Sequence, residues 1–358
     1  MEQEKIHLLR ATAVPLLAWY GKNRRDLPWR HTRDPYRIWV SEIMLQQTRV
    51  AAVIPYYERW MEALPDAAAL AAAEEGALMK LWEGLGYYSR ARNLQKAAKM
   101  IVNDLGGVFP SCREALLALP GVGEYTAGAV ASIAFGQRVP AVDGNVLRLA
   151  ARVADIRENV LDPKVKKDIA AAMEEAVPGS DPGGYNQALM DMGATVCLPN
   201  GQPLCTQCPL RALCRARALG IQDQLPLREK KAARRRDQLT VFVLLQGDRV
   251  ALRQRKDTGL LAGLWEFPNV PEALDEGGAA DMLAEWGLSP LNWRERRTAR
   301  HLFTHVEWAM TGYTVQVRGE DNQGFTWADL AMLSELAVPS AFAKYLAAAR
   351  EALAPRIY

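Results

Sequence analysis

Apolar positions recur at spacings of three and four residues from the start of the chain to about residue 220, and turn signals divide them into runs. This period is that of amphipathic α-helices. Asp34 before Pro35 is typical of an N-cap with a first-turn proline, and Ser111 with Glu114 is typical of a capping box. The pattern predicts a mainly α first domain over residues 1–222.

The pattern changes after a polar and basic segment, LPLREKKAARRRDQ. Beyond it, β-rich runs flank Gly247 and Asp248, which predicts a hairpin, and WAMTGYTVQV predicts a further strand before a helical C-terminus. We therefore expect a linker over residues 223–237 and an α+β domain over residues 238–358. The basic run fits a solvated linker and a strap that contacts phosphates equally well.

Composition adds little to this division. A chain of 358 residues, 49% hydrophobic and 24% charged, is ordinary for a folded protein of two domains that does not need an oligomer to fold. The net charge of +3 permits a polyanionic partner without arguing for one. The N-terminus lacks the long apolar run of a signal peptide or membrane span. We expect a cytoplasmic monomer with no membrane partner.

Four of the five cysteines crowd into one short stretch with the spacing CxxxxxxxCxxCxxxxxC. They are Cys197, Cys205, Cys208 and Cys214. In a reducing compartment such crowding favours metal ligation over disulfides, and burial as simple hydrophobic side chains is the weaker alternative. The spacing leaves zinc and an iron-sulfur cluster both open. The isolated Cys112 is expected only to pack.

Residues 111–135, SCREALLALPGVGEYTAGAVASIAF, predict a helix, a tight turn and a second helix. Gly121 and Gly123 bracket Val122 in the turn. Unshielded amides at the start of the second helix suit a phosphate oxygen, because a helix N-terminus carries partial positive charge. An ordinary αα-hairpin with glycines for tight packing is the alternative.

The hairpin and the cysteine motif together resemble the helix-hairpin-helix superfamily of endonuclease III and the adenine DNA glycosylases. The segment RIWVSEIMLQQTRV resembles the signature of the adenine glycosylases, the MutY family, and GLLAGLWEFP resembles their Nudix-like C-terminal domain. The resemblance implies a helical glycosylase fold with a 4Fe-4S cluster, although the first cysteine gap has seven residues where that family usually has six. It also implies a DNA-associated enzyme of base excision repair that removes adenine paired with 8-oxoguanine or guanine in duplex DNA.

The resemblance places the catalytic acid at Glu42, which would protonate N7 of a flipped adenine. Burial beside Trp39 or Met44 would raise its pKa towards neutrality. Asp143, in VPAVDGNVLR, would stabilise an oxocarbenium-like transition state. Each carboxylate taken alone is more commonly a surface residue or a helix cap, so the assignment depends on the two matching motifs.

Tyr125 stands where the bifunctional branch of the superfamily has its nucleophilic lysine. Tyrosine cannot form a Schiff base, so a monofunctional glycosylase without lysine-dependent lyase activity is expected. Tyr125 and Asn145 would orient the two carboxylates. Two rivals stay open: an endonuclease III-like lyase, and a catalytically silent mismatch-binding protein.

The resemblance also implies the residues that receive the base and the DNA. Around the flipped adenine it places Arg25, Trp29, Arg30 and Gln187. At the DNA it places Gln47, Thr48, Gly86, Tyr87, Tyr88, Gly121, Val122 and Gly123. The alternative for the segment LWEGLGYYSRARN is a glycine turn with packing aromatics.

Phe303, Thr304 and His305 match the family's FSH loop, which senses the oxidised guanine, with threonine in place of serine. His305 taken alone is more readily a satisfied histidine beside a strand. The glutamates after Pro268 are scattered and lack the REUxEE core of a working Nudix hydrolase. We expect the second domain to recognise the lesion rather than to hydrolyse nucleotides.

Overall fold

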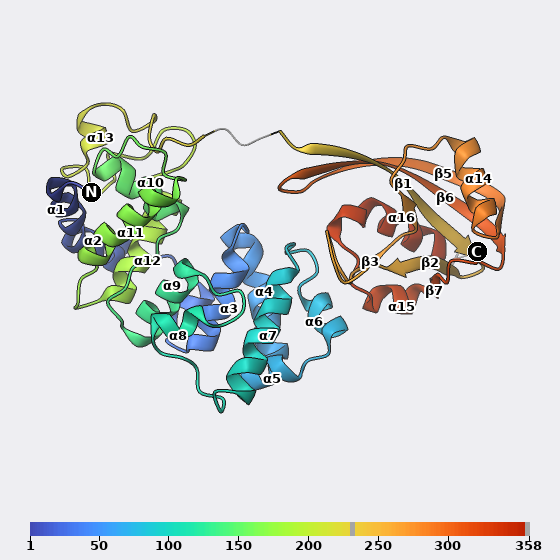
Figure 1. Cartoon of the computed structure of the whole chain (residues 1–358), viewed down its shortest axis with the longest axis horizontal. Coiled ribbons are helices and arrows are strands. Elements are labelled where there is room, and N and C mark those ends of the chain that lie inside the picture. The colour runs from blue at the N-terminus through green and yellow to red at the C-terminus, as the bar shows by residue number, and fades with distance from the viewer. Residues whose placement is uncertain (230–232, 355–358) are drawn as a thin grey trace. The chain divides into compact units, whose positions relative to one another are not determined.

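The computed structural model describes residues 1–229 and 233–354. The chain divides into two compact units, which we describe separately (Figure 1). Unit 1 comprises Met1–Ala73 and Arg92–Lys230, and unit 2 comprises Glu74–Ala91 and Lys231–Tyr358. The segment 74–91 was expected within the first domain. Residues 230–232 of the expected linker lie outside the described residues, and the first strand already begins at Arg235.

Unit 1 is built of helices. They are α1 (Gln3–Arg10), α2 (Ala13–Asn23), η1 (Pro28–Arg30), α3 (Pro35–Leu45), α4 (Val50–Ala63), α5 (Ala67–Ala72), most of α7 (Ser89–Asn103), α8 (Arg113–Leu117), α9 (Glu124–Phe135), α10 (Gly144–Val153), α11 (Pro163–Ala176), α12 (Pro182–Thr195) and α13 (Arg215–Ala218). The prediction of a mainly α first domain is confirmed. Among the described residues, no helix combines the length and the apolar character needed to cross a membrane.

Two of the helix starts show where local sequence reasoning succeeds and fails. Asp34 caps α3 as predicted, because its side chain accepts a hydrogen bond from the amide of Tyr36 and Pro35 occupies the first turn. The predicted capping box at Ser111 and Glu114 is wrong. Helix α8 begins one residue later, and its N-cap position is held by Cys112, whose side chain makes no capping hydrogen bond.

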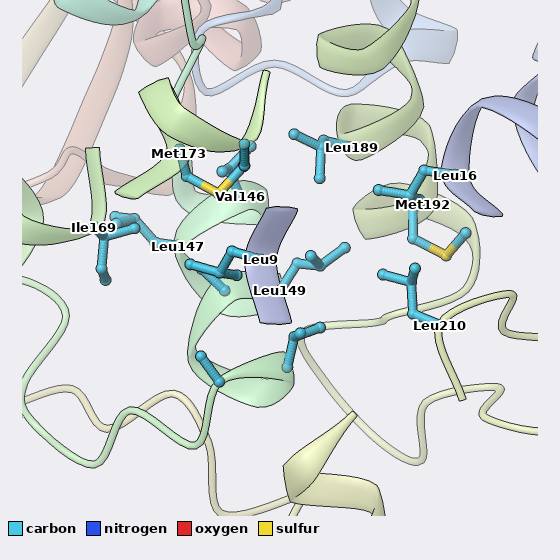
Figure 2. Packing of buried hydrophobic residues seen from close by; sticks show 14 of the residues in the cluster. Leu9, Leu16, Val146, Leu147, Leu149, Ile169, Met173, Leu189, Met192 and Leu210 are labelled. Carbon is cyan, nitrogen blue, oxygen red and sulfur yellow. The ribbon is translucent and has the colours of Figure 1, made fainter. Parts of the chain in front are cut away.

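One hydrophobic core of unit 1 lies where α1, α2, α10, α11 and α12 meet. Leu9 and Leu16 from the first two helices pack against Leu149, Met173 and Met192 (Figure 2). All five side chains are almost completely buried. Since burial of one such side chain contributes about 1.5–3 kcal/mol, this cluster is a major source of the stability of unit 1.

Unit 2 is an α+β structure, as predicted. Its elements are α6 (Glu75–Leu81), β1 (Arg235–Gln246), β2 (Arg249–Gln254), β3 (Trp265–Glu266), β4 (Asn269–Val270), α14 (Glu276–Glu285), β5 (Leu288–Leu302), β6 (Val306–Gly319), β7 (Thr326–Ala328), α15 (Leu330–Glu335), η2 (Ser340–Phe342) and α16 (Ala343–Leu353). Hydrogen bonds from Lys80 Nζ to the carbonyl of Leu336 and from the Val338 amide to Glu83 help to anchor segment 74–91 to the rest of this unit.

The sheet has the strand order β3-β2-β1-β6-β5, with β1 and β6 parallel and the other pairs antiparallel. Gly247 and Asp248 form the turn between β1 and β2, as predicted. Alternate residues of β1 enter different cores: Val241 and Val243 pack in the cluster that contains Tyr345 of α16, and Phe242 packs in the cluster that contains Leu283 of α14. The sheet is therefore buried on both faces, each covered by a helix.

Candidate active site

Glu42 lies on α3, and only 4% of its surface is exposed. The hydroxyl of Tyr125, on α9, donates a 2.5 Å hydrogen bond to Glu42 Oε2. Burial raises the pKa of Glu42 above its ordinary value, in the direction expected from the sequence. Burial also raises the pKa of Tyr125 well above its ordinary value, so its hydroxyl keeps its proton and acts as the donor. Burial thus favours a protonated carboxyl at Glu42, and the hydrogen bond from Tyr125 opposes that effect in part.

Asp143 is the N-cap of α10. Its carboxylate accepts hydrogen bonds from the amides of Asn145 and Val146, both at 2.8 Å, and from Asn145 Nδ2 at 2.7 Å. Burial raises the pKa of Asp143, and these three donors oppose that rise. The carboxylate therefore caps a helix and also belongs to the active-site network.

The two carboxyl groups differ in their partners. Asp143 receives three hydrogen bonds, whereas Glu42 receives one, from Tyr125, among the described residues. The charge of Asp143 further raises the pKa of Glu42, and the guanidinium of Arg30 opposes that effect. The hydrogen bonds stabilise the ionised form of Asp143 more than that of Glu42. Such a difference suits Glu42 to remain protonated while Asp143 is ionised.

A buried polar network lies beside these carboxyls. Arg25 and Arg30 both pair with Asp191, at 2.7 and 3.1 Å, and Asp191 on α12 is completely buried. Arg30 Nη1 also donates to the hydroxyl of Tyr20, which donates to Gln187 Oε1. Three of the predicted pocket residues, Arg25, Arg30 and Gln187, thus belong to one network.

Sequence reasoning missed Tyr20 and Asp191. One signal was present: an aspartate within the apolar run ALMDMGA is unusual on a packed helix face and calls for a cation. The predicted pocket residue Trp29 is 3% exposed, and its ring meets that of Tyr57 edge-on at 5.3 Å. Trp29 is therefore a core residue here, and its contact with a base remains a prediction.

The predicted DNA hairpin is formed by α8, a turn and α9. Gly121 has φ +76°, and a β-carbon added there would lie 2.6 Å from Asn93 Cβ. Gly123 is the N-cap of α9 and has open space around the position of a β-carbon. Both glycines are exposed, whereas Val122 between them is buried. The turn leaves the start of α9 open to a ligand such as a phosphate.

Two further predicted DNA-contacting loops contain strained backbone. Gln47, after α3, has φ +60° and is exposed, with Thr48 half-buried beside it. Separately, Gly86 has φ +70° and Tyr87 has φ +49°. Non-glycine residues with positive φ are uncommon and cluster at functional sites.

Tyr87 and Tyr88 differ in exposure. Tyr87 is 46% exposed, whereas Tyr88 is 5% exposed and packs inward. The guanidinium of Arg90 lies 5.5 Å from the centre of the Tyr87 ring and donates to the carbonyls of Leu85 and Gly86. Arg90, which sequence reasoning missed, therefore supports the loop that presents Tyr87.

Phe303, Thr304 and His305 form the turn between β5 and β6, closed by a hydrogen bond from the Phe303 amide to the carbonyl of Val306. The Phe303 ring meets Trp308 edge-on at 4.8 Å and anchors the turn. The Thr304 hydroxyl lies 2.8 Å from the Tyr87 hydroxyl, within unit 2. Thr304 and His305 are exposed.

The four clustered cysteines line one cavity. Burial and the neighbouring thiols raise the pKa of Cys208 to about 11. Arg152 Nη1 approaches Cys197 Sγ at 3.2 Å. Within residues 1–229 and 233–354, no three His, Cys, Asp or Glu side chains converge closely enough for a metal ion. The four thiols line the same cavity, and thiolates are ligands for both zinc and iron-sulfur clusters.

Arg148 joins the cysteine loop to the active site. Its guanidinium donates to Asn145 Oδ1, to the carbonyl of Gly193 and to the carbonyl of Cys197, at 2.7–2.9 Å. Only 3% of Arg148 is exposed. The same side chain therefore contacts the residue that orients Asp143 and the backbone of a predicted cluster ligand.

Known proteins share both regions of the chain. The model of the HhH-GPD superfamily base excision DNA repair protein matches residues 40–178, and that of the NUDIX domain matches residues 240–348. The adenine DNA glycosylase of Homo sapiens is 38% identical over a match that spans 85% of this chain and 67% of the human protein. The adenine DNA glycosylase of Schizosaccharomyces pombe is 32% identical over a match that spans 81% of this chain and 78% of the yeast protein. The chain belongs to the adenine DNA glycosylase family.

Solved structures share the fold of the helical region of this adenine glycosylase family member. A thermostable thymine-DNA glycosylase is 32% identical with a TM-score of 0.54, and covers 60% of this chain and 98% of its own. Endonuclease III in a non-covalent DNA complex is 25% identical with a TM-score of 0.52, and covers 61% and 98%. These similarities agree with the predicted helix-hairpin-helix fold.

Proposed function

We propose that this chain is a monofunctional DNA glycosylase that hydrolyses the N-glycosidic bond of adenine opposite 8-oxoguanine or guanine in duplex DNA. The observation that carries the proposal is the buried Glu42 carboxyl, held by Tyr125 at 2.5 Å. Adenine leaves poorly as an anion, so its excision needs a general acid whose proton is retained near neutral pH. Membership of the adenine DNA glycosylase family supports this substrate.

In the proposed reaction the adenine is flipped out of the duplex, and Glu42 donates its proton to N7 of the base. Positive charge then develops on the sugar as the bond to nitrogen breaks. Asp143 stabilises that charge, while Asn145 holds its carboxylate through the 2.7 Å hydrogen bond. A water molecule then adds to C1′ and gives up a proton to the Glu42 carboxylate, which restores the acid. Arg25, Trp29, Arg30 and Gln187 surround the base.

The absence of a lysine at position 125 supports a monofunctional enzyme. Tyr125 is committed to Glu42 and cannot form a Schiff base with the sugar. Strand breaks should therefore require alkali after base loss. Breaks without alkali would instead favour the lyase alternative.

The DNA contacts and the lesion reader are proposed from exposed turns. Gly121 and Gly123 lie at the open start of α9, and Gln47 and Tyr87 would fill the gap in the duplex and probe the opposite base. Thr48, Gly86 and the buried Tyr88 belong to the same proposed DNA-contacting loops. Thr304 and His305, on the turn anchored by Phe303, would read the 8-oxoguanine. We propose a monomer acting on DNA in the cytoplasm.

The four cysteines are proposed to hold a 4Fe-4S cluster, which would cross-link the loop after α12. Cys197, Cys205, Cys208 and Cys214 would be its ligands, and Arg152 would offset part of their charge. Iron and acid-labile sulfide in near-equal amounts, with visible absorbance, are expected from the purified protein. Zinc with no visible absorbance would overturn this assignment.

The function is tested by single-turnover cleavage of duplexes with adenine opposite 8-oxoguanine, guanine or thymine, with and without hot alkali. Wild type should give alkali-dependent breaks, fastest opposite 8-oxoguanine. Glu42→Gln should lower the rate roughly a hundredfold or more, the scale of general acid catalysis. The matched control is Glu58→Gln, on the exposed face of α4, which should behave as wild type. Tight binding without base release by wild type would make the chain a recognition protein.

A further inference from the structure

The hydroxyl of Tyr20 stands between two residues of the proposed base pocket. It lies 2.8 Å from Arg30 Nη1 and 2.6 Å from Gln187 Oε1. Tyr20 is on α2, 8% exposed, and Gln187 is on α12. All three side chains line one cavity, together with Ser132 and Gly183. Neither the catalytic acid nor the carboxylate Asp143 contacts Tyr20 through a hydrogen bond in the described part of the chain.

The direction of these hydrogen bonds is fixed by chemistry. A guanidinium has donors and no acceptor, so the Tyr20 oxygen must accept from Arg30. Its single proton then remains for another partner, and Gln187 is the one at hydrogen-bond distance. A buried hydroxyl that failed to donate would leave its proton unsatisfied, which destabilises the folded state. Burial also raises the pKa of Tyr20, which keeps that proton in place.

The orientation of the Gln187 amide follows from this chain of donors. Oxygen and nitrogen of a side-chain amide are distinguished by their hydrogen-bond network rather than by shape. Because Tyr20 donates, the atom facing it must be Gln187 Oε1. Gln187 Nε2 has no hydrogen-bond partner among residues 1–229 and 233–354, so the amide offers its NH₂ group to whatever enters the cavity.

We infer that Tyr20 is a positioning residue that makes Gln187 a hydrogen-bond donor towards the base, selecting a purine that presents a ring-nitrogen acceptor. This inference rests on the proposed function, because it names what the pocket recognises in adenine. With N7 assigned to Glu42, the remaining acceptors of adenine are N1 and N3. The exocyclic amino group of adenine is a donor, so it cannot be the partner of Gln187 Nε2.

Base analogues and a hydroxyl deletion test the inference together. The substrates carry adenine, 1-deazaadenine, 3-deazaadenine or unsubstituted purine opposite 8-oxoguanine. The enzymes are wild type, Tyr20→Phe and Tyr185→Phe. The last is a matched control, because the Tyr185 hydroxyl is also buried and pairs with Thr12 between the same two regions, without touching Gln187. Single-turnover rates and melting temperatures are measured for each.

The rate penalty for removing one ring nitrogen of adenine, N1 or N3, should depend on the Tyr20 hydroxyl. In wild type, replacing that nitrogen by CH should slow release roughly 3- to 10-fold beyond its intrinsic chemical effect, the scale of one hydrogen bond. In Tyr20→Phe that excess should vanish, because the amide is no longer held. The penalty for losing the amino group should be the same in both enzymes. Tyr185→Phe should keep the wild-type pattern while losing comparable thermal stability.

Other patterns overturn the inference. Coupling of Tyr20 to the amino group alone would mean that Gln187 presents its carbonyl. Equal slowing of all four substrates by Tyr20→Phe would reduce Tyr20 to a structural residue. Failure of wild type to release any adenine would overturn the proposed function as well, and is distinguishable because no rate would then be measurable.

Discussion

The proposed catalytic pocket of unit 1 and the β5–β6 turn of unit 2 are held in opposite ways. In the pocket, Glu42 and Asp143 are buried, and partners from other helices or from the same cap fix their carboxyl groups. In the turn, Thr304 and His305 are exposed, and Phe303 supplies the anchor. Chemistry in the pocket should therefore depend on single atoms, whereas recognition by the turn should tolerate small changes of side chain.

The largest effect is expected from Asp143→Asn. Asparagine caps helices about as well as aspartate, so the stability of α10 should change little. Loss of the negative charge should slow adenine release by roughly a hundredfold or more, because the developing positive charge on the sugar loses its counter-charge. Single-turnover rates with melting temperatures check this. Wild-type rates in the variant would remove Asp143 from the mechanism.

The pH dependence should expose the different states of the two carboxyls. The pKa of Glu42 is raised by burial, and its protonated form is the proposed acid, so the rate should fall as pH rises through that pKa. At lower pH the rate should fall as Asp143 becomes protonated. Glu42→Gln should abolish the fall in rate at high pH. An unchanged fall in this variant would assign it to another group.

The same raised pKa predicts a change in stability. The folded state holds a proton at Glu42 that the unfolded chain has already released, so this contribution is complete below the unfolded pKa and lost as pH rises through the folded one. Glu42→Gln should therefore gain melting temperature relative to wild type as pH rises across that window. Parallel melting curves for the two proteins would contradict the burial argument.

A smaller effect, on stability, is expected where the turn between α8 and α9 approaches Asn93. Gly121→Ala combines a positive φ with a contact at 2.6 Å from Asn93, and should destabilise unit 1 by about 1–3 kcal/mol. Gly123→Ala meets nothing within 4 Å and is the matched control. Denaturant unfolding of both variants measures the difference. Equal losses would mean that Asn93 moves aside at no cost.

The smallest effect should come from the exposed turn. Thr304→Ala and His305→Ala should each leave the melting temperature unchanged and reduce the preference for 8-oxoguanine over guanine by roughly 3- to 10-fold, the scale of one hydrogen bond. Excision opposite guanine should hold its rate. A collapse of both rates would show that the turn supports folding rather than recognition.

Sequence patterns predicted correctly several features that depend on residues close together in the chain. The Asp34 cap, the β1–β2 turn and the helical period of unit 1 were predicted because neighbours in sequence determine them. The predicted capping box at Ser111 is wrong because α8 begins one residue later than the spacing of Ser111 and Glu114 requires. Asp143 and Asn145 were predicted together, and their hydrogen bond closes over two residues.

The missed residues depend on distant partners. Tyr20 and Asp191 acquire their roles only when α2 and α12 pack together, and no short motif contains both. Arg148 likewise connects Asn145 with Cys197 across separate segments. The contact of Trp29 with Tyr57 was likewise not predicted, because tertiary packing decides which face of an aromatic ring is covered.

The Tyr20–Arg30–Asp191–Gln187 network also sets how far the working unit extends along the chain. The matched repair-protein region spans residues 40–178, and every member of this network lies outside it. A fragment cut to that region would keep Glu42, Tyr125 and Asp143 yet lose this network, which belongs to the proposed base pocket. Loop closure over more than 160 residues must precede assembly of the network, because Gln187 is 167 residues from Tyr20. The adenine pocket should therefore be among the last parts of unit 1 to form, after both ends of the helical region are present.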